Sequence, residues 1–103
     1  MVKRTAPPDV PPVVIDGVRY EAPTDGRDRD LDQDGGYIVA RDDASGAQLW
    51  SLKVYDTGPD PAGMQVDVYI TSMKKKWLRP QLAVKNERGD SYTVHLDTRT
   101  VTS

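Results

Sequence analysis

The sequence predicts a small all-β domain, an antiparallel barrel or sandwich of about six to seven strands. Short segments rich in Val, Ile, Tyr and Thr recur along the chain, separated by turn signals that contain Gly, Asp or Asn. Several of these segments alternate apolar with polar residues, which is typical of half-buried strands. No segment has convincing helical periodicity, so we expect almost no helix.

The chain length predicts a single domain, because 103 residues fall within the usual size of one folding unit. Residues 1–12 contain four prolines and no periodic pattern, and we interpret them as a flexible Pro-rich tail. Residues 13–103 are then expected to form one β domain.

Two β-prone runs, 13–15 and 18–22, flank the dipeptide Asp16-Gly17. An Asp-Gly pair between two such runs is typical of a hairpin with a type I′ turn, in which both central residues have positive φ. A polar loop is expected at 23–36.

A second hairpin is expected at Tyr37 to Tyr55, with strands at 37–42 and 48–55. On its second strand, Trp50, Leu52 and Val54 share one face because side chains alternate along a strand.

Alternating residues also predict a half-buried strand over 66–71, and the lysine run 74–76 is interpreted as the turn after it. Strands at 82–85 and 91–97 are expected around the four-residue loop Asn86–Gly89, with Tyr92, Val94 and Leu96 pointing inward.

The composition excludes several classes of protein. A net charge of −2 and a pI near 5.2 argue against bulk attraction to nucleic acid or to an anionic membrane. The absence of cysteine excludes disulfides, thiolate metal sites and cysteine nucleophiles. No apolar run reaches the roughly 18 residues of a membrane helix. No apolar stretch follows the basic pair near the start, so we expect no secretory signal and a cytoplasmic location.

The segment between the two strands of the second hairpin carries the clearest motif, formed by Ala40, Asp42, Ser45, Gly46 and Trp50. It resembles the tryptophan-docking repeat of quinoprotein (PQQ-like) β-propellers. The resemblance implies that Trp50 packs against a neighbouring blade. The chain holds one copy, whereas a closed propeller needs at least about four blades of about 40 residues. We therefore expect an incomplete propeller unit without quinone binding or dehydrogenase activity.

The physical roles of these motif residues can be predicted without the family. The Asp42 carboxylate can accept backbone N–H bonds within the turn, and Gly46 can supply the positive φ that closes it. Ala40 leaves room beside the strand for the Trp50 ring.

The acidic loop before the second hairpin contains Asp30, Asp32 and Asp34 followed by Gly35. This spacing resembles the first half of an EF-hand calcium loop. Arg41 occupies the position where the bidentate glutamate would be expected. The sequence leaves two alternatives open, a Ca²⁺ site and a solvated loop.

A basic segment, Lys74, Lys75, Lys76, Trp77 and Arg79, combines positive charge with an aromatic ring. That composition suits a contact with an acidic protein or a nucleic acid. The alternative is a lysine-rich turn that keeps a sheet edge soluble. The net negative charge of the chain favours the second interpretation.

No catalytic motif is present, and the single histidine, His95, is expected to point outward because it alternates with Val94 and Leu96. We therefore predict a non-catalytic interaction or structural module that contacts a protein partner or a second copy through Trp50 and the basic segment. The alternatives are a calcium-binding domain and a small enzyme whose site lies across distant strands.

Overall fold

The computed structural model describes residues 10–29, 31–57, 68–76 and 79–103. Within these residues the chain forms eight β-strands and one short 3₁₀ helix. The strands are β1 (Val13–Ile15), β2 (Val18–Glu21), β3 (Tyr37–Asp42), β4 (Gln48–Lys53), β5 (Ile70–Lys75), β6 (Gln81–Asn86), β7 (Ser91–His95) and β8 (Thr100–Thr102).

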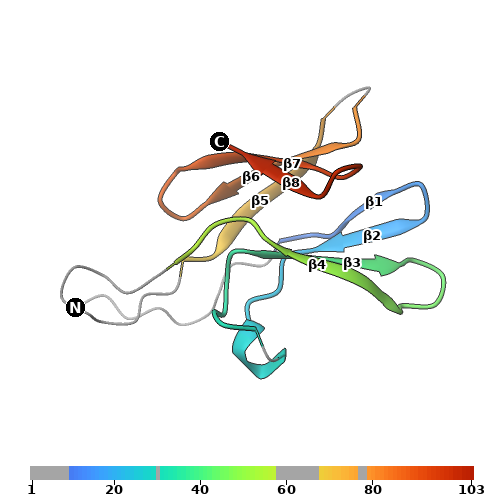
Figure 1. Cartoon of the computed structure of the whole chain (residues 1–103), viewed down its shortest axis with the longest axis horizontal. Helices are drawn as coiled ribbons and strands as arrows, with labels where there is room; N and C mark the ends of the chain where they lie inside the picture. The colour runs from blue at the N-terminus through green and yellow to red at the C-terminus, as the bar shows by residue number, and fades with distance from the viewer. Residues whose placement is uncertain (1–9, 30, 58–67, 77–78) are drawn as a thin grey trace.

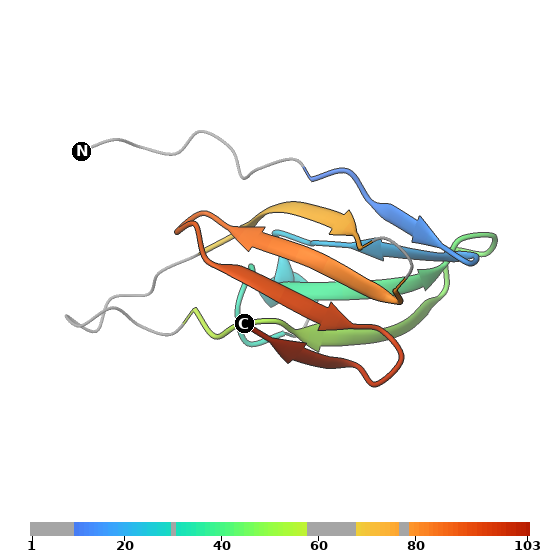
Figure 2. The same cartoon turned by 90° about the horizontal axis from the view of Figure 1, so that it is seen from above.

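The strands form two four-stranded antiparallel sheets, each a simple meander in chain order. We call β1-β2-β3-β4 the N-terminal sheet and β5-β6-β7-β8 the C-terminal sheet. The two sheets lie one above the other (Figure 1), with β1 beside β5 along one margin and β4 near β8 along the other (Figure 2). No described strand pairs with a strand of the other sheet, so the described sheets do not close into one cylinder.

The hairpin turns follow the local rules that the sequence suggested. Asp16 and Gly17 have φ values of 52° and 80°, as a type I′ turn requires. Gly89 has a φ of 82°, and the Asn86 side-chain oxygen accepts the backbone N–H groups of Arg88 and Asp90 at 3.0 Å each. Both turns are therefore determined by residues that lie within them.

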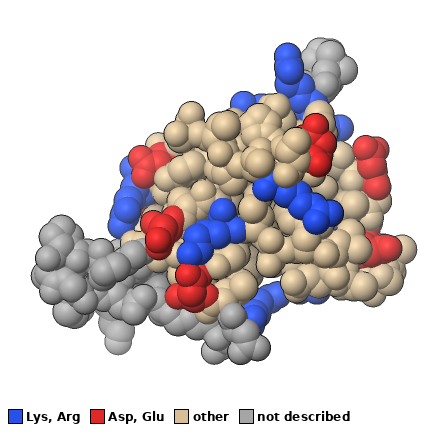
Figure 3. Space-filling model, viewed as in Figure 1, with Lys and Arg blue, Asp and Glu red and all other residues tan. Residues whose placement is uncertain are grey.

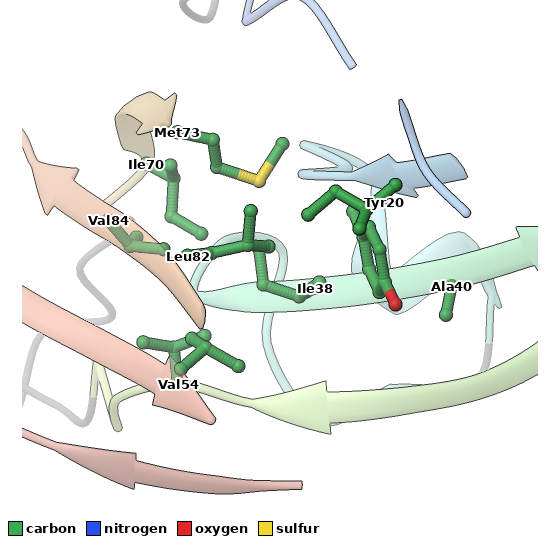
Figure 4. Packing of buried hydrophobic residues seen from close by; sticks show 10 residues of the cluster. Tyr20, Ile38, Ala40, Val54, Ile70, Met73, Leu82 and Val84 are labelled. Atoms are coloured by element: carbon green, nitrogen blue, oxygen red, sulfur yellow. The ribbon is translucent and has the colours of Figure 1, made fainter. Parts of the chain in front are cut away.

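The hydrophobic core lies between the sheets, where the inward-facing residues of both meet (Figure 4). Ile38 comes from the N-terminal sheet, Leu82 and Val94 from the C-terminal sheet, and all three are completely buried. Burial of side chains of this size contributes roughly 1.5–3 kcal/mol each. Neither sheet could bury its apolar face alone, so the shared core holds the two sheets together.

The strand predicted over 66–71 is confirmed only at Ile70 and Thr71, because Val68 and Tyr69 are not part of a strand, and the turn predicted at 74–76 is wrong. β5 begins at Ile70 and includes Lys74 and Lys75, while residues 66 and 67 lie outside the described residues. The register shifts between Ile70 and Ser72, which marks a bulge. The bulge places the buried Ile70 and Met73 three residues apart, so strict alternation does not continue through the second half of the strand.

β8 is a further strand that the sequence did not indicate. It spans three residues and follows a turn in which Arg99 has a φ of 56°. Arginine has no special preference for positive φ, so the sequence carries no turn signal there. Leu96, which was expected inside the last strand, lies just beyond the end of β7 and still packs against the core.

The loop between β2 and β3 lies on the outer side of the N-terminal sheet and contains the 3₁₀ helix η1 (Gly26–Arg29) (Figure 1). Val39 points to this side, opposite to Ile38 and Ala40, yet it is only 1% exposed. The outer face of the sheet is therefore covered at Val39.

No helix in the described residues has the length and apolarity that a membrane span requires.

Candidate functional site

Trp50 lies on the inner face of β4, close to the margin that β4 shares with β8. Its Cα is directly opposite that of Ala40 on β3, and its ring is 5.9 Å from the Tyr20 ring, tilted by 57°. The guanidinium of Arg99, from the turn before β8, lies 5.2 Å from the Trp50 ring centroid. Trp50 is half-buried, with Tyr20 and Arg99 against its ring.

The turn that precedes β4 has the geometry that its residues predicted. The Asp42 Oδ1 atom accepts the N–H groups of Ala44 at 2.9 Å and of Ser45 at 3.3 Å. Gly46 has a φ of 77° and donates its N–H to the Asp42 carbonyl at 2.7 Å. The small Ala40 leaves space opposite Trp50. The motif therefore acts, at the least, as a turn that positions the tryptophan.

β4 is an edge strand whose outer side has no partner strand among the described residues. Val54 donates its N–H to the Gly36 carbonyl at 2.7 Å, which sets the hydrogen-bond alternation along the strand. The N–H groups of Trp50 and Leu52 therefore point toward β3, and that of Ser51 points away from it. Leu49 is 52% exposed on the same strand. β4 thus presents open backbone groups beside one exposed apolar side chain, Leu49.

The basic segment does not form one surface, because its lysines alternate across β5. Lys74 and Lys76 line a hollow of about 310 Å³ on the outer face of the C-terminal sheet. Lys75 lines a second hollow of about 250 Å³, together with Arg79 and Asp16, at the end of the β1–β2 hairpin.

Trp77 lies outside the described residues. Trp50 lines neither of the two hollows. The structure therefore separates the predicted partner-binding residues into different places.

The first hollow also contains Lys85, a residue that the sequence analysis did not single out. Lys85 is paired with Ser72 and Ser91 on the neighbouring strands, so it shares the outer face with Lys74. We call the hollow lined by Ser72, Lys74, Lys76, Lys85, Ser91 and Thr93 the lysine hollow. Alternation along β6 could have placed Lys85 outside, but its nearness to Lys74 depends on the strand register.

In the acidic loop, the Asp32 carboxylate already has two partners. Its Oδ2 lies 2.6 Å from the Lys53 ammonium, and its Oδ1 accepts the Tyr37 hydroxyl at 2.6 Å. The hydrogen bond from Lys53, followed by that from Tyr37, holds the pKa of Asp32 below its usual value. A calcium ion at this carboxylate would have to compete with the lysine for it.

No group of three or more potential metal ligands is found in the described part of the chain, from which Asp30 is missing. Asp34 is described and has an interaction of its own. The geometry of the loop thus adds no support to a calcium site, which stays a prediction.

A residue that the sequence analysis missed, Gln33, anchors this loop. It is 3% exposed, and its Nε2 donates to the carbonyls of Gly35 and Tyr55 at 2.8 Å each. Its Oε1 accepts the Thr57 backbone N–H at 3.1 Å. A glutamine in a polar loop gives no signal of burial, because the amide's partners come from segments far apart in the chain.

His95 points to the outer face of the C-terminal sheet, as expected, and is half-buried there. Its Nδ1 is 3.1 Å from the Gln81 Nε2, and its Nε2 is 3.0 Å from the Thr102 Oγ1. No described carboxylate lies within bonding distance of the ring, so the nucleophile, base and acid arrangement of hydrolases is not assembled around it in the described residues.

Comparison of the chain with protein-family models, with curated proteins and with solved structures finds no match. The likeness of the Ala40–Trp50 motif to propeller repeats therefore stays a prediction. Two surfaces of this chain are arranged to contact another molecule, the outer edge of β4 and the lysine hollow.

Proposed function

We propose that this domain is a non-catalytic interaction module that pairs with a second copy of itself along the open edge of β4. The observation that carries the proposal concerns β4, a six-residue strand that has no partner on its outer side among the described residues. This strand carries the exposed Leu49 beside the partly buried Trp50. Exposed edges of this kind favour the addition of another strand.

The residues of β4 suit self-pairing in particular. The strand carries one charged side chain, Lys53, and that lysine is already paired with Asp32. Two copies related by a twofold axis would present the same row of N–H and C=O groups to each other without strong repulsion. The added strand would join the two N-terminal sheets and cover more of Trp50.

We further propose that the two sheets form a sandwich and not a barrel. A barrel has no edge strands, whereas a sandwich keeps them. The pairing of β4 with a second copy depends on this difference, because only an open sheet can accept another strand.

The proposal is tested by sedimentation equilibrium of the full chain and of the S51P variant. Proline at position 51 removes the N–H that points away from β3, so the sheet keeps its own hydrogen bonds. We expect wild-type protein to dimerise and S51P to be monomeric, with circular dichroism confirming that the variant is folded.

A second pair of variants keeps the test decisive if S51P does not fold. L49K places a charge on the β4 edge, and V14K makes the same change at the other large hydrophobic residue that is 52% exposed, on β1. L49K should weaken dimerisation by at least about fivefold, whereas V14K should not. A monomeric wild type, or equal effects of both variants, would overturn the proposal.

A further inference from the structure

On the outer face of the C-terminal sheet, residues that are directly opposite one another on β5, β6 and β7 form rows across the strands. Ala83, at the middle of β6, is directly opposite Lys74 on β5 and Thr93 on β7. The adjacent row consists of Ser72, Lys85 and Ser91. A small residue at the centre of larger ones produces a depression, and the lysine hollow lies at this place, with Ala83 among its lining residues.

The donors around the hollow have few internal partners. No ion pair joins Lys74, Lys76 or Lys85 to a described carboxylate, and no aspartate or glutamate lines the hollow. The Lys76 ammonium donates to the Thr93 Oγ1 at 2.9 Å, which holds one positive charge beside a hydroxyl. Ser103, the last residue of the chain, also lines the hollow. The side chains of the lining are therefore rich in donors and include three lysines.

We infer that the lysine hollow is a binding site for a small multivalent oxyanion, a phosphate or sulfate group. Ammonium and hydroxyl donors are the groups that bind such anions, and a hollow of about 310 Å³ holds several non-hydrogen atoms. The site lies on the sheet opposite to β4, so it does not depend on the proposed dimerisation.

A short anion fits the surroundings better than a long polyanion. Positive and negative side chains are interspersed over the face of the molecule that Figure 3 shows, and the net charge of the chain is −2. A nucleic acid strand that extended beyond the hollow would meet carboxylates as well as lysines. The outer face of the C-terminal sheet faces the viewer in Figure 2. Most of the residues that line the hollow belong to β5, β6 and β7 of this sheet.

The test is isothermal titration calorimetry of the full chain with inorganic pyrophosphate, with sulfate as a parallel titrant. We expect K74Q and K85Q each to weaken pyrophosphate binding by at least about fivefold. K75Q removes the same charge from the same lysine run but on the other side of β5, so it should leave the affinity within about twofold. The two titrants distinguish a phosphate site from a sulfate site.

A fourth variant, A83L, fills the floor of the hollow and keeps every charge. Ala83 points outward, so leucine there should leave the thermal stability nearly unchanged while abolishing pyrophosphate binding. Absence of pyrophosphate and sulfate binding would overturn the inference. So would equal losses in K75Q and K74Q together with full binding by A83L, since that result indicates unspecific attraction. Binding of single-stranded oligonucleotide in preference to pyrophosphate would also contradict it.

Discussion

The inner faces of the two sheets pack together in one apolar core, whereas their outer faces differ in how their charged side chains are paired. On the N-terminal sheet, Glu21 bonds Arg41 at 2.8 Å and Arg19 at 3.1 Å, so the outer charges neutralise one another. A loop also lies on that side, where Val39 is fully covered. On the C-terminal sheet, Lys74 and Lys85 have no described carboxylate partner.

This difference separates structural from binding roles. Charged side chains that form ion pairs within the chain bind a ligand only weakly. Lysines around a depression that form no such ion pair can still bind an anion. The covered N-terminal sheet is then expected to interact through its edge, and the bare C-terminal sheet through its face.

The largest expected effect concerns the core that both sheets share. I38A and L82A each remove a completely buried side chain from one sheet. Each should lower the free energy of unfolding by about 2–5 kcal/mol. Urea denaturation followed by tryptophan fluorescence and by circular dichroism should give one coincident transition for both variants.

Val14 provides the control, because it is exposed on β1 and lies outside the proposed β4 interface, and V14A should change the free energy of unfolding by less than about 0.5 kcal/mol. Two separate transitions would show that the sheets unfold independently, contrary to a shared core.

An intermediate effect on the unfolding free energy is expected from a substitution in the loop between β2 and β3, which lies against the N-terminal sheet only. Q33L keeps most of the buried volume but removes the bonds to Gly35, Tyr55 and Thr57. Unpaired buried groups should then cost about 1–3 kcal/mol of unfolding free energy. Hydrogen exchange should also become faster around Gly35, while the amides of β6 and β7 keep their protection.

Q48L makes the same substitution at an exposed glutamine and should leave the unfolding free energy nearly unchanged. If Q33L lowered protection equally in both sheets, the loop would support the whole domain and not one sheet.

The smallest effect on stability is expected from a change of pH, which tests the ion pairs on the outer face of the N-terminal sheet. Burial raises the pKa of Glu21, but hydrogen bonds from Arg41 and Arg19 outweigh this and hold the pKa below its ordinary value of 4.5. The ionised Glu21 carboxylate therefore contributes fully to stability above pH 4.5, and this contribution is lost as the pH falls through the lowered pKa. The contribution should be at most about 1 kcal/mol, because the pair is partly exposed.

Urea denaturation of wild type and E21Q across this range measures the effect. The stability difference between the two proteins should shrink as the pH falls. D90N removes a carboxylate without a described ion pair and controls for the loss of one negative charge. A pH-independent difference between wild type and E21Q would mean that the ion pairs contribute nothing.

Much of the fold could be predicted because its signals are local. Asp16-Gly17 and Asn86–Gly89 specify their turns through their own φ angles and side-chain hydrogen bonds. Apolar alternation on β4 and β7 identified the inward faces. The prediction was wrong in the second half of β5, where the strand continues beyond a bulge through Lys75. It also missed the turn before β8, which has Arg99 at positive φ and no glycine.

The candidate sites could be predicted less well, because they depend on residues brought together across strands. The sequence grouped Lys74, Lys75 and Lys76 by position, whereas the pleat of β5 separates Lys75 from the other two. The contact of Arg99 with Trp50 joins residues of different sheets and has no local signal.

By itself, the sequence determined the all-β class, the turns and most of the inward faces, since these follow from side chains within a few residues of one another. Tertiary structure decided that two sheets share one core, that Gln33 is buried, and that Ala83 lies at the centre of a lysine-lined hollow. The physical reason is that register and packing combine distant segments, and their energies depend on partners that no short stretch of sequence contains.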